Sequence, residues 1–143
     1  MIDFQTSNVE MPDIDLEKTG RWLGIVAASH GKRVGNINYL FCSDADILDA
    51  NRKYLGHDYF TDIITFDYSH DDKIAGDIYL SLVTVATNAE ELGEPYRREL
   101  MRVIAHGVLH LCGINDKGPG EREIMEANEN AALALWDEMN CCL

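Results

Sequence analysis

Two histidines, His106 and His110, stand four residues apart in an otherwise apolar segment. If this segment is an α-helix, the spacing places both imidazole rings on one face, close enough to bind one ion. Gly113 follows three residues later and can end the helix by adopting a positive φ, and Asp116 lies three residues beyond it. The spacing predicts three metal ligands and a position left for water, which is typical of catalytic metal sites.

The same residues also allow simpler roles. Two histidines on an apolar helix can be packed or hydrogen-bonded core residues. Asp116 stands beside Lys117 and the turn-forming segment 118–120, so it can be a turn residue or a helix cap. The complete set favours metal binding, because the histidine pair, the glycine and the carboxylate occur together at suitable intervals.

The chemistry that such a site supports is metal-assisted hydrolysis. A bound divalent ion lowers the pKa of its water toward about 7 and polarises a carbonyl or phosphoryl oxygen. Zinc proteases with a paired-histidine helix place a glutamate directly after the first histidine as the general base. Here that position is Gly107, which argues against a peptidase of this type. Spacing alone assigns no catalytic residue besides the ligands.

The rest of the chain predicts the elements that position these residues. β-branched and aromatic residues predict four strands, and apolar periodicity with capping residues predicts five helices. The strands are expected at 2–4, 34–42, 61–66 and 77–82, with a connecting loop at 69–73. The helices are expected from a cap at Asp13 or Asp15 to His30-Gly31, from a cap at Ser43 or Asp44 to about Gly56, at about 82–92, from Pro95 to Gly113, and at about 121–140. We therefore expect residues 1–143 to form a single α+β domain.

Composition narrows the classes of function. The formal net charge of −13 argues against a protein that coats nucleic acid, because such proteins are usually basic. Basic residues do cluster at 32–33, at 52–53 and at 97–102, as solvated surface charge or as a local patch for RNA. The N-terminus has no export signal, so the four cysteines predict reduced thiols and a cytoplasmic protein. No apolar run is long enough to span a membrane.

The segment from His106 to Gly113 also resembles the H-G-x-L-H-L-x-G signature of the YbeY family, metal-dependent endoribonucleases of ribosomal RNA maturation. Upstream, residues 51–54 and 58–66 resemble the family's N-x-x-Y-R…D-x-P-T-D-V-L-S-F segment. Gly76-Asp77-Ile78 resembles its G-D-I strand, and residues 89–93 resemble the helix that follows. The resemblance covers about residues 40–126, with the segments in family order and at family spacing.

This resemblance implies a compact α+β fold in which a small mixed four-stranded sheet packs with about five helices. It implies one divalent ion, zinc, held at the mouth of a cleft by three residues, here His106, His110 and Asp116. It further implies a metallohydrolase-like endoribonuclease that cuts single-stranded RNA, matures the 3′ end of 16S rRNA and takes part in ribosome quality control. The implied partners are ribosomal RNA and the small ribosomal subunit, without DNA or membrane.

Two positions depart from the family pattern. Asp116 replaces the usual third histidine, which lowers the net charge of the site by one. We therefore expect a weaker Lewis acid and better competition from harder ions such as Mn²⁺. Leu55 stands where the family usually has an arginine, a natural partner for a phosphate. Arg102 and Arg98 precede His106 at four-residue intervals and are candidates to supply that charge.

Other roles remain open for the residues around the site. Arg102 can instead form a surface salt bridge with Glu99 or Glu94, and Asp62 can simply anchor a turn. His57 is either a proton carrier or an exposed loop histidine. Cys112 is expected to point away from the metal as a buried cysteine. At the level of function, the alternatives are a ribosome-assembly factor whose metal mainly stabilises the fold, and a metal hydrolase of another substrate.

Overall fold

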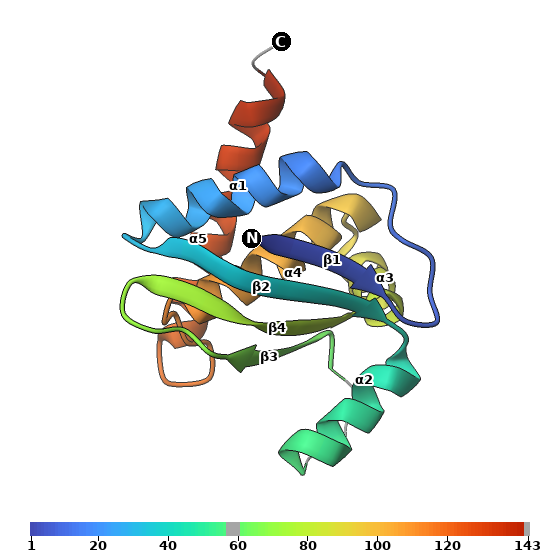
Figure 1. Cartoon of the computed structure of the whole chain (residues 1–143). Helices are drawn as coiled ribbons and strands as arrows, with labels where there is room; N and C mark the ends of the chain where they lie inside the picture. Colours follow the sequence, from blue (N-terminus) through green and yellow to red (C-terminus); the bar gives the residue numbers. More distant parts are fainter. Residues whose placement is uncertain (57–60, 142–143) are drawn as a thin grey trace.

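The computed structural model describes residues 1–56 and 61–141, without the side chains of Leu55 and Cys141. Its centre is a sheet of four strands in the order β1-β2-β4-β3 (Figure 1). The strands are β1 (Ile2–Thr6), β2 (Arg33–Cys42), β3 (Ile63–Asp67) and β4 (Lys73–Ser81). β2 runs parallel to both β1 and β4, whereas β3 is antiparallel to β4 and forms one edge. The expected mixed four-stranded sheet is confirmed.

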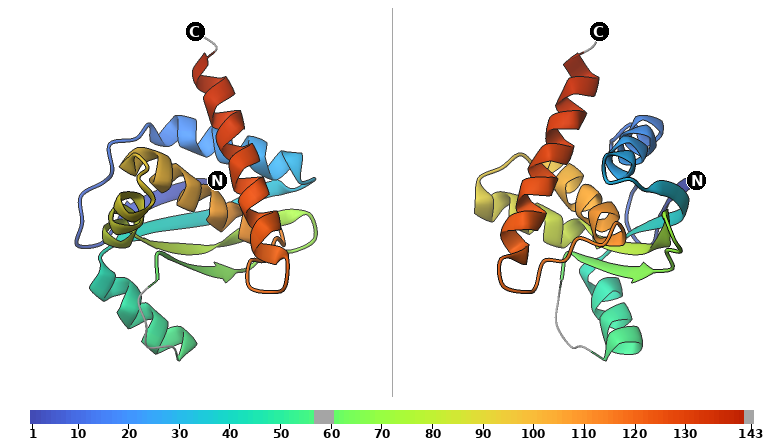
Figure 2. Two further views of the ribbon diagram at one scale, coloured as in Figure 1. Left: turned by 180° about the vertical axis from the view of Figure 1, so that it is seen from behind. Right: turned by 90° about the vertical axis from the view of Figure 1, so that its left-hand side faces the viewer.

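Four helices cover one face of this sheet, and a fifth extends from the other (Figures 1 and 2). The covering helices are α1 (Leu16–Ser29), α3 (Leu82–Leu92), α4 (Tyr96–Leu111) and α5 (Glu121–Cys141). On the opposite face lies α2 (Asp44–Ala50), which continues into the π-helical turn η1 (Asn51–Leu55). The expected α+β fold with about five helices is confirmed. No helix among the described residues is long and apolar enough to cross a membrane.

The helix boundaries follow from local chemistry. The Asp15 side chain accepts a hydrogen bond from the Lys18 backbone N–H, so Asp15 rather than Asp13 is the N-cap of α1. Ser43 caps α2 in the same way through the backbone N–H of Asp46. Each cap satisfies a backbone donor that the first turn of the helix leaves without a partner.

Strand β4 begins earlier than the sequence pattern predicts. It starts at Lys73 rather than at 77, because Lys73 pairs with Arg33 of β2. The connection between β3 and β4 is correspondingly tight, and Asp71 in it has φ = 55°. Partner strands satisfy the backbone of these residues, and burial alternates along the strand from Lys73 on, although the residue types at 73–76 do not show this pattern.

The main core lies between the sheet and helices α1, α4 and α5. Helix α4 approaches the sheet most closely at Gly107, where an added Cβ would lie 2.9 Å from Cδ1 of Ile78 and 3.2 Å from Cδ1 of Ile63. Position 107 therefore faces the sheet, and a glutamate there would have to enter the core. Gly107 stands where zinc proteases have their catalytic glutamate, and in this protein it is a packing residue.

Candidate metal centre

Helix α4 carries both histidines on one face. It begins after Pro95, which has an extended backbone, and ten of its residues are buried against the sheet and the neighbouring helices. The rings of His106 and His110 lie parallel, with centroids 6.4 Å apart and planes 5° apart. This is the arrangement expected for an i, i+4 pair.

The end of α4 brings Asp116 back to the first histidine. Gly113 has φ = 97°, its N–H donates to the carbonyl of His110, and the N–H of Ile114 donates to the carbonyl of Leu109. This double hydrogen bond is a Schellman motif, which reverses the chain and confirms that Gly113 ends the helix. As a result, Oδ2 of Asp116 lies 3.3 Å from Nε2 of His106.

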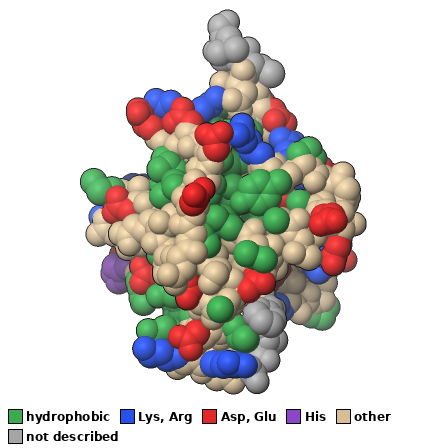
Figure 3. Space-filling view, turned by 90° about the vertical axis from the view of Figure 1, so that its right-hand side faces the viewer, with side chains coloured by type: hydrophobic (Ala, Val, Ile, Leu, Met, Phe, Trp, Pro, Cys, Tyr) green, Lys and Arg blue, Asp and Glu red, His purple; other side chains and the backbone are tan. Residues whose placement is uncertain are grey.

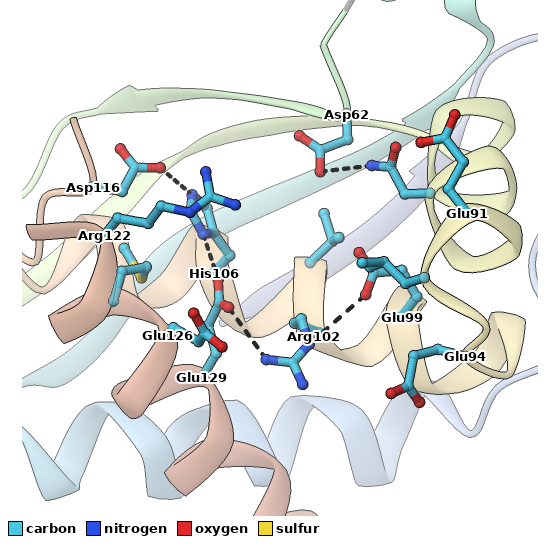
Figure 4. Close-up of a pocket in the computed structure, with 14 residues that line it drawn as sticks. Asp62, Glu91, Glu94, Glu99, Arg102, His106, Asp116, Arg122, Glu126 and Glu129 are labelled. Atoms are coloured by element: carbon cyan, nitrogen blue, oxygen red, sulfur yellow. Dashed lines mark hydrogen bonds and ion pairs between the residues drawn. The ribbon is translucent and has the colours of Figure 1, made fainter.

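Glu129 of α5 holds the other nitrogen of the same ring. Its Oε2 lies 2.7 Å from Nδ1 of His106 (Figure 4). Burial by itself lowers the pKa of His106, but the hydrogen bond and charge of Glu129, with Asp116 and Asp62, outweigh it and raise the pKa. A carboxylate that accepts from Nδ1–H directs the lone pair of Nε2 toward a metal ion, as in many metal sites. Glu129 could not be found from the sequence pattern, because it lies 23 residues from His106 on another helix.

The donor atoms fit a divalent ion in part. Among the described residues, no three His, Cys, Asp or Glu side chains converge closely enough to hold one. The 3.3 Å between His106 Nε2 and Asp116 Oδ2 nevertheless matches the edge of a tetrahedral zinc site with bonds of about 2.0–2.1 Å. Nδ1 of His110 is buried and has no hydrogen-bond partner within the described part of the chain. A three-ligand site requires the His110 ring to approach the other two donors.

Two cavities meet at this group of residues. The first has a volume of about 550 Å³ and the second about 240 Å³. Three residues, Asp62, His106 and Asp116, line both. In the close-up of the first cavity, Asp62 lies across from Asp116, and α4 and α5 carry the groups below them (Figure 4). The candidate metal centre therefore stands where a substrate could enter from two sides.

Asp62 both anchors the chain and faces the cavities. Its backbone carbonyl accepts from the N–H of Ser81, which supports the anchoring role. Its carboxylate accepts a hydrogen bond of 3.4 Å from Asn88 of α3. Burial raises the pKa of Asp62, and the nearby His106 partly opposes this shift.

The two arginines that the sequence suggested are already paired. Arg98 forms two hydrogen bonds with Asp137, of 2.8 and 3.1 Å, and lines neither cavity, so the prediction that it supplies charge to the site is wrong. Arg102 lies 3.4 Å from Glu129, 3.0 Å from Asn130 and 3.7 Å from Glu99. The alternative of a salt bridge with Glu99 is confirmed. Arg102 thus supports Glu129, which in turn holds His106.

Other predicted residues lie outside this group. His57 and Asp58 are not among the described residues, and the side chain of Leu55 is not described. Cys112 is partly buried against the core, and burial raises the pKa of its thiol to about 11. This supports its role as a packing residue rather than a reactive thiolate.

Figure 3 shows one face of the molecule, on which acidic and basic side chains surround apolar ones. The described basic residues on this face form no continuous patch.

A helix-borne histidine pair beside a carboxylate and two open cavities is typical of metal-dependent hydrolases. The family model described as Endoribonuclease YbeY matches residues 1–137. The chain is 65% identical over 135 residues to the endoribonuclease YbeY of Phocaeicola vulgatus, covering 94% of this chain and 98% of that protein. It is 61% identical over 134 residues to the endoribonuclease YbeY of Bacteroides thetaiotaomicron, with the same coverage of 94% and 98%.

The fold has a counterpart among solved structures. The solution structure of TM1509 from Thermotoga maritima superposes with a TM-score of 0.71 at 27% identity, covering 99% of this chain and 93% of that one. The chain belongs to the endoribonuclease YbeY family. This confirms the resemblance seen in the sequence and, with it, the expectation of a hydrolase of the endoribonuclease class.

Proposed function

We propose that this protein is a metal-dependent, cytoplasmic endoribonuclease that cuts single-stranded ribosomal RNA. Its proposed tasks are maturation of the 3′ end of 16S rRNA and ribosome quality control, with the small ribosomal subunit as partner. Membership of an endoribonuclease family supports the reaction. The observation that carries the proposal is the meeting of two cavities at Asp62, His106 and Asp116, which lets a strand extend to both sides of the reacting bond.

His106, His110 and Asp116 are the proposed ligands of one divalent ion, zinc, within a single domain spanning residues 1–143. Two nitrogens and one carboxylate oxygen are donors that suit zinc, and the carboxylate also improves the fit to Mn²⁺. When bound, the ion supplies Lewis acidity and lowers the pKa of water. The Glu129 carboxylate keeps the proton of His106 on Nδ1, so Nε2 is available as a ligand.

Asp62 is the proposed proton acceptor. In the hydrolysis, the oxygen of water bonds to phosphorus and gives one proton to Asp62, the bond from phosphorus to a ribose oxygen breaks, and that oxygen takes up one proton from solvent water. Asp62 borders both cavities beside His106 and Asp116, and its carboxylate accepts a hydrogen bond from Asn88. A carboxylate in this position can remove the proton from the attacking water.

The test is a double variant, His106→Ala with His110→Ala, assayed on single-stranded RNA that spans the 3′ end of 16S rRNA. We expect it to lose both the bound metal, measured by elemental analysis, and cleavage. His70→Ala is the control, because His70 is an exposed histidine that pairs with Asp71 and lines neither cavity. Full cleavage by the metal-free double variant would refute the proposal.

A ribosome-assembly factor with a mainly structural metal is the second candidate. The first cavity favours it, since seven of its lining residues are carboxylates, which repel phosphate: Asp62, Glu91, Glu94, Glu99, Asp116, Glu126 and Glu129. Binding to small subunits without any RNA turnover would support this candidate. A metal hydrolase of another substrate, such as a peptidase, lacks support, because position 107 faces the sheet.

A further inference from the structure

The first cavity poses an electrostatic problem for a nuclease. Its lining contains seven carboxylates and only two cationic side chains, Arg102 and Arg122. A phosphodiester carries a negative charge, and its non-bridging oxygens gain more as water adds to phosphorus. Unless a positive group besides the proposed divalent ion faces the reacting bond, this excess of carboxylates opposes both binding and reaction.

Arg102 is not available for this purpose. Its guanidinium lies near Glu99, Glu129 and Asn130, and its side chain is only 26% exposed. To bind a phosphate it would have to leave Glu129, which holds His106. Its charge is already used to offset two buried carboxylates.

Arg122 differs from Arg102 in both its exposure and its lack of ion pairs among the described residues. It lies in the first turn of α5 and is exposed, and no hydrogen bond or ion pair joins it to another residue within 1–56 and 61–141. It lines the same cavity as His106 and Asp116, and Figure 4 shows its side chain extending from α5 toward that pair. The neighbouring acid, Glu121, folds back against Gly118, so it does not pair with Arg122.

We propose that Arg122 binds the phosphate at the bond being cut and acts as a catalytic residue. The inference rests on the proposed function, since it names the group that offsets the charge of the phosphate. The planar guanidinium donates N–H hydrogen bonds to the non-bridging oxygens as their charge grows, and no proton is transferred to or from it.

The test compares Arg122→Ala, Arg122→Lys and the control Arg21→Ala. Arg21 is also an exposed cation, on α1, with one weak pair to Glu17, so its loss changes the net charge by the same amount outside both cavities. We expect Arg122→Ala to lower kcat on single-stranded 16S precursor RNA by about 10²-fold. Arg122→Lys should recover part of this loss, because it keeps the charge but not the planar pair of donors. Arg21→Ala should leave kcat unchanged.

A second measurement does not depend on cleavage. Binding of fluorescein-labelled 2′-O-methyl RNA is followed by anisotropy at several salt concentrations. For Arg122→Ala, loss of one phosphate contact should reduce the magnitude of the slope of the logarithm of the association constant against the logarithm of the salt concentration by about 0.7. The Arg21→Ala slope should equal that of the wild type.

The outcomes separate the two proposals. If wild-type protein cuts the RNA but Arg122→Ala matches Arg21→Ala in kcat and in slope, the role of Arg122 is refuted. An increase in KM with kcat unchanged also overturns it, because the contact would then be absent from the transition state. If the wild type does not cut RNA although the slope changes at Arg122, the proposed function fails while the phosphate contact stands.

Discussion

The two cavities that share Asp62, His106 and Asp116 differ in the elements that line them and in the charge of their lining residues. Helices α3, α4 and α5 supply the larger one, and most of its polar groups are charged and linked to one another. The smaller one is bordered by η1, β3 and the loop after α4, and its other lining residues are mostly uncharged: Asn51, Thr61, Ile63, Ile64 and Thr65. We infer that the larger cavity supplies the charged groups that hold His106 and adjust the metal centre, and that the smaller one, which also carries His110, mainly binds the strand.

The sharpest test of this division is Asp62→Asn, because Asp62 belongs to both cavities. Asparagine keeps the size of the side chain but cannot accept the proton of water. We expect kcat to fall by about 10²–10⁴-fold in single-turnover cleavage, with the metal content unchanged. A variant that cuts RNA at the wild-type rate would remove Asp62 from the reaction.

Glu129→Gln tests the larger cavity alone. The amide removes the negative charge that the Nδ1–H of His106 faces, so the ligand becomes less basic. We expect metal affinity, measured by competition with a chelator, to fall by about 10–100-fold. Glu126→Gln is the matched control, since Glu126 lines the same cavity and has no ion pair among the described residues. Equal affinities of the two variants would contradict the role of Glu129.

Asp116→His tests the charge of the centre itself. A third imidazole removes one negative charge, which should increase the preference for zinc over Mn²⁺. Elemental analysis of both proteins, purified without added metal, measures this preference. The same zinc selectivity in wild type and variant would show that the carboxylate does not determine the metal.

The smallest effect is expected for Lys117→Ala in the smaller cavity. Lys117 lines that cavity, and no ion pair joins it to another residue of the described chain. Its loss should raise the KM for RNA by less than about tenfold and leave kcat unchanged, because one exposed charge contributes little. A large fall in kcat would instead place the smaller cavity in the reaction and remove the distinction between the two.

Local signals predicted much of the fold correctly. Asp15 and Ser43 lie at helix starts because their side chains accept hydrogen bonds from backbone N–H groups of the first turn. Gly113 lies at a helix end because its positive φ allows the closing backbone hydrogen bonds. The start of β4 was missed because it depends on pairing with β2, about forty residues earlier in the chain. The sequence pattern also did not predict the π-helical turn η1. This turn matters for the site, because its first residue, Asn51, is buried and lines the smaller cavity.

The sequence by itself determined the spacing of His106 and His110, the helix end at Gly113, and membership of the family, because these depend on residues close together or on an ordered series of motifs. Only the tertiary structure decided that Glu129 holds His106 and that Asp62 joins two cavities. It also decided that Arg102 is paired, whereas Arg122 has no partner in the part of the chain that the structure describes. The reason is physical: a side chain's charge and hydrogen bonds depend on which helices pack beside it, and packing brings together residues that the sequence separates.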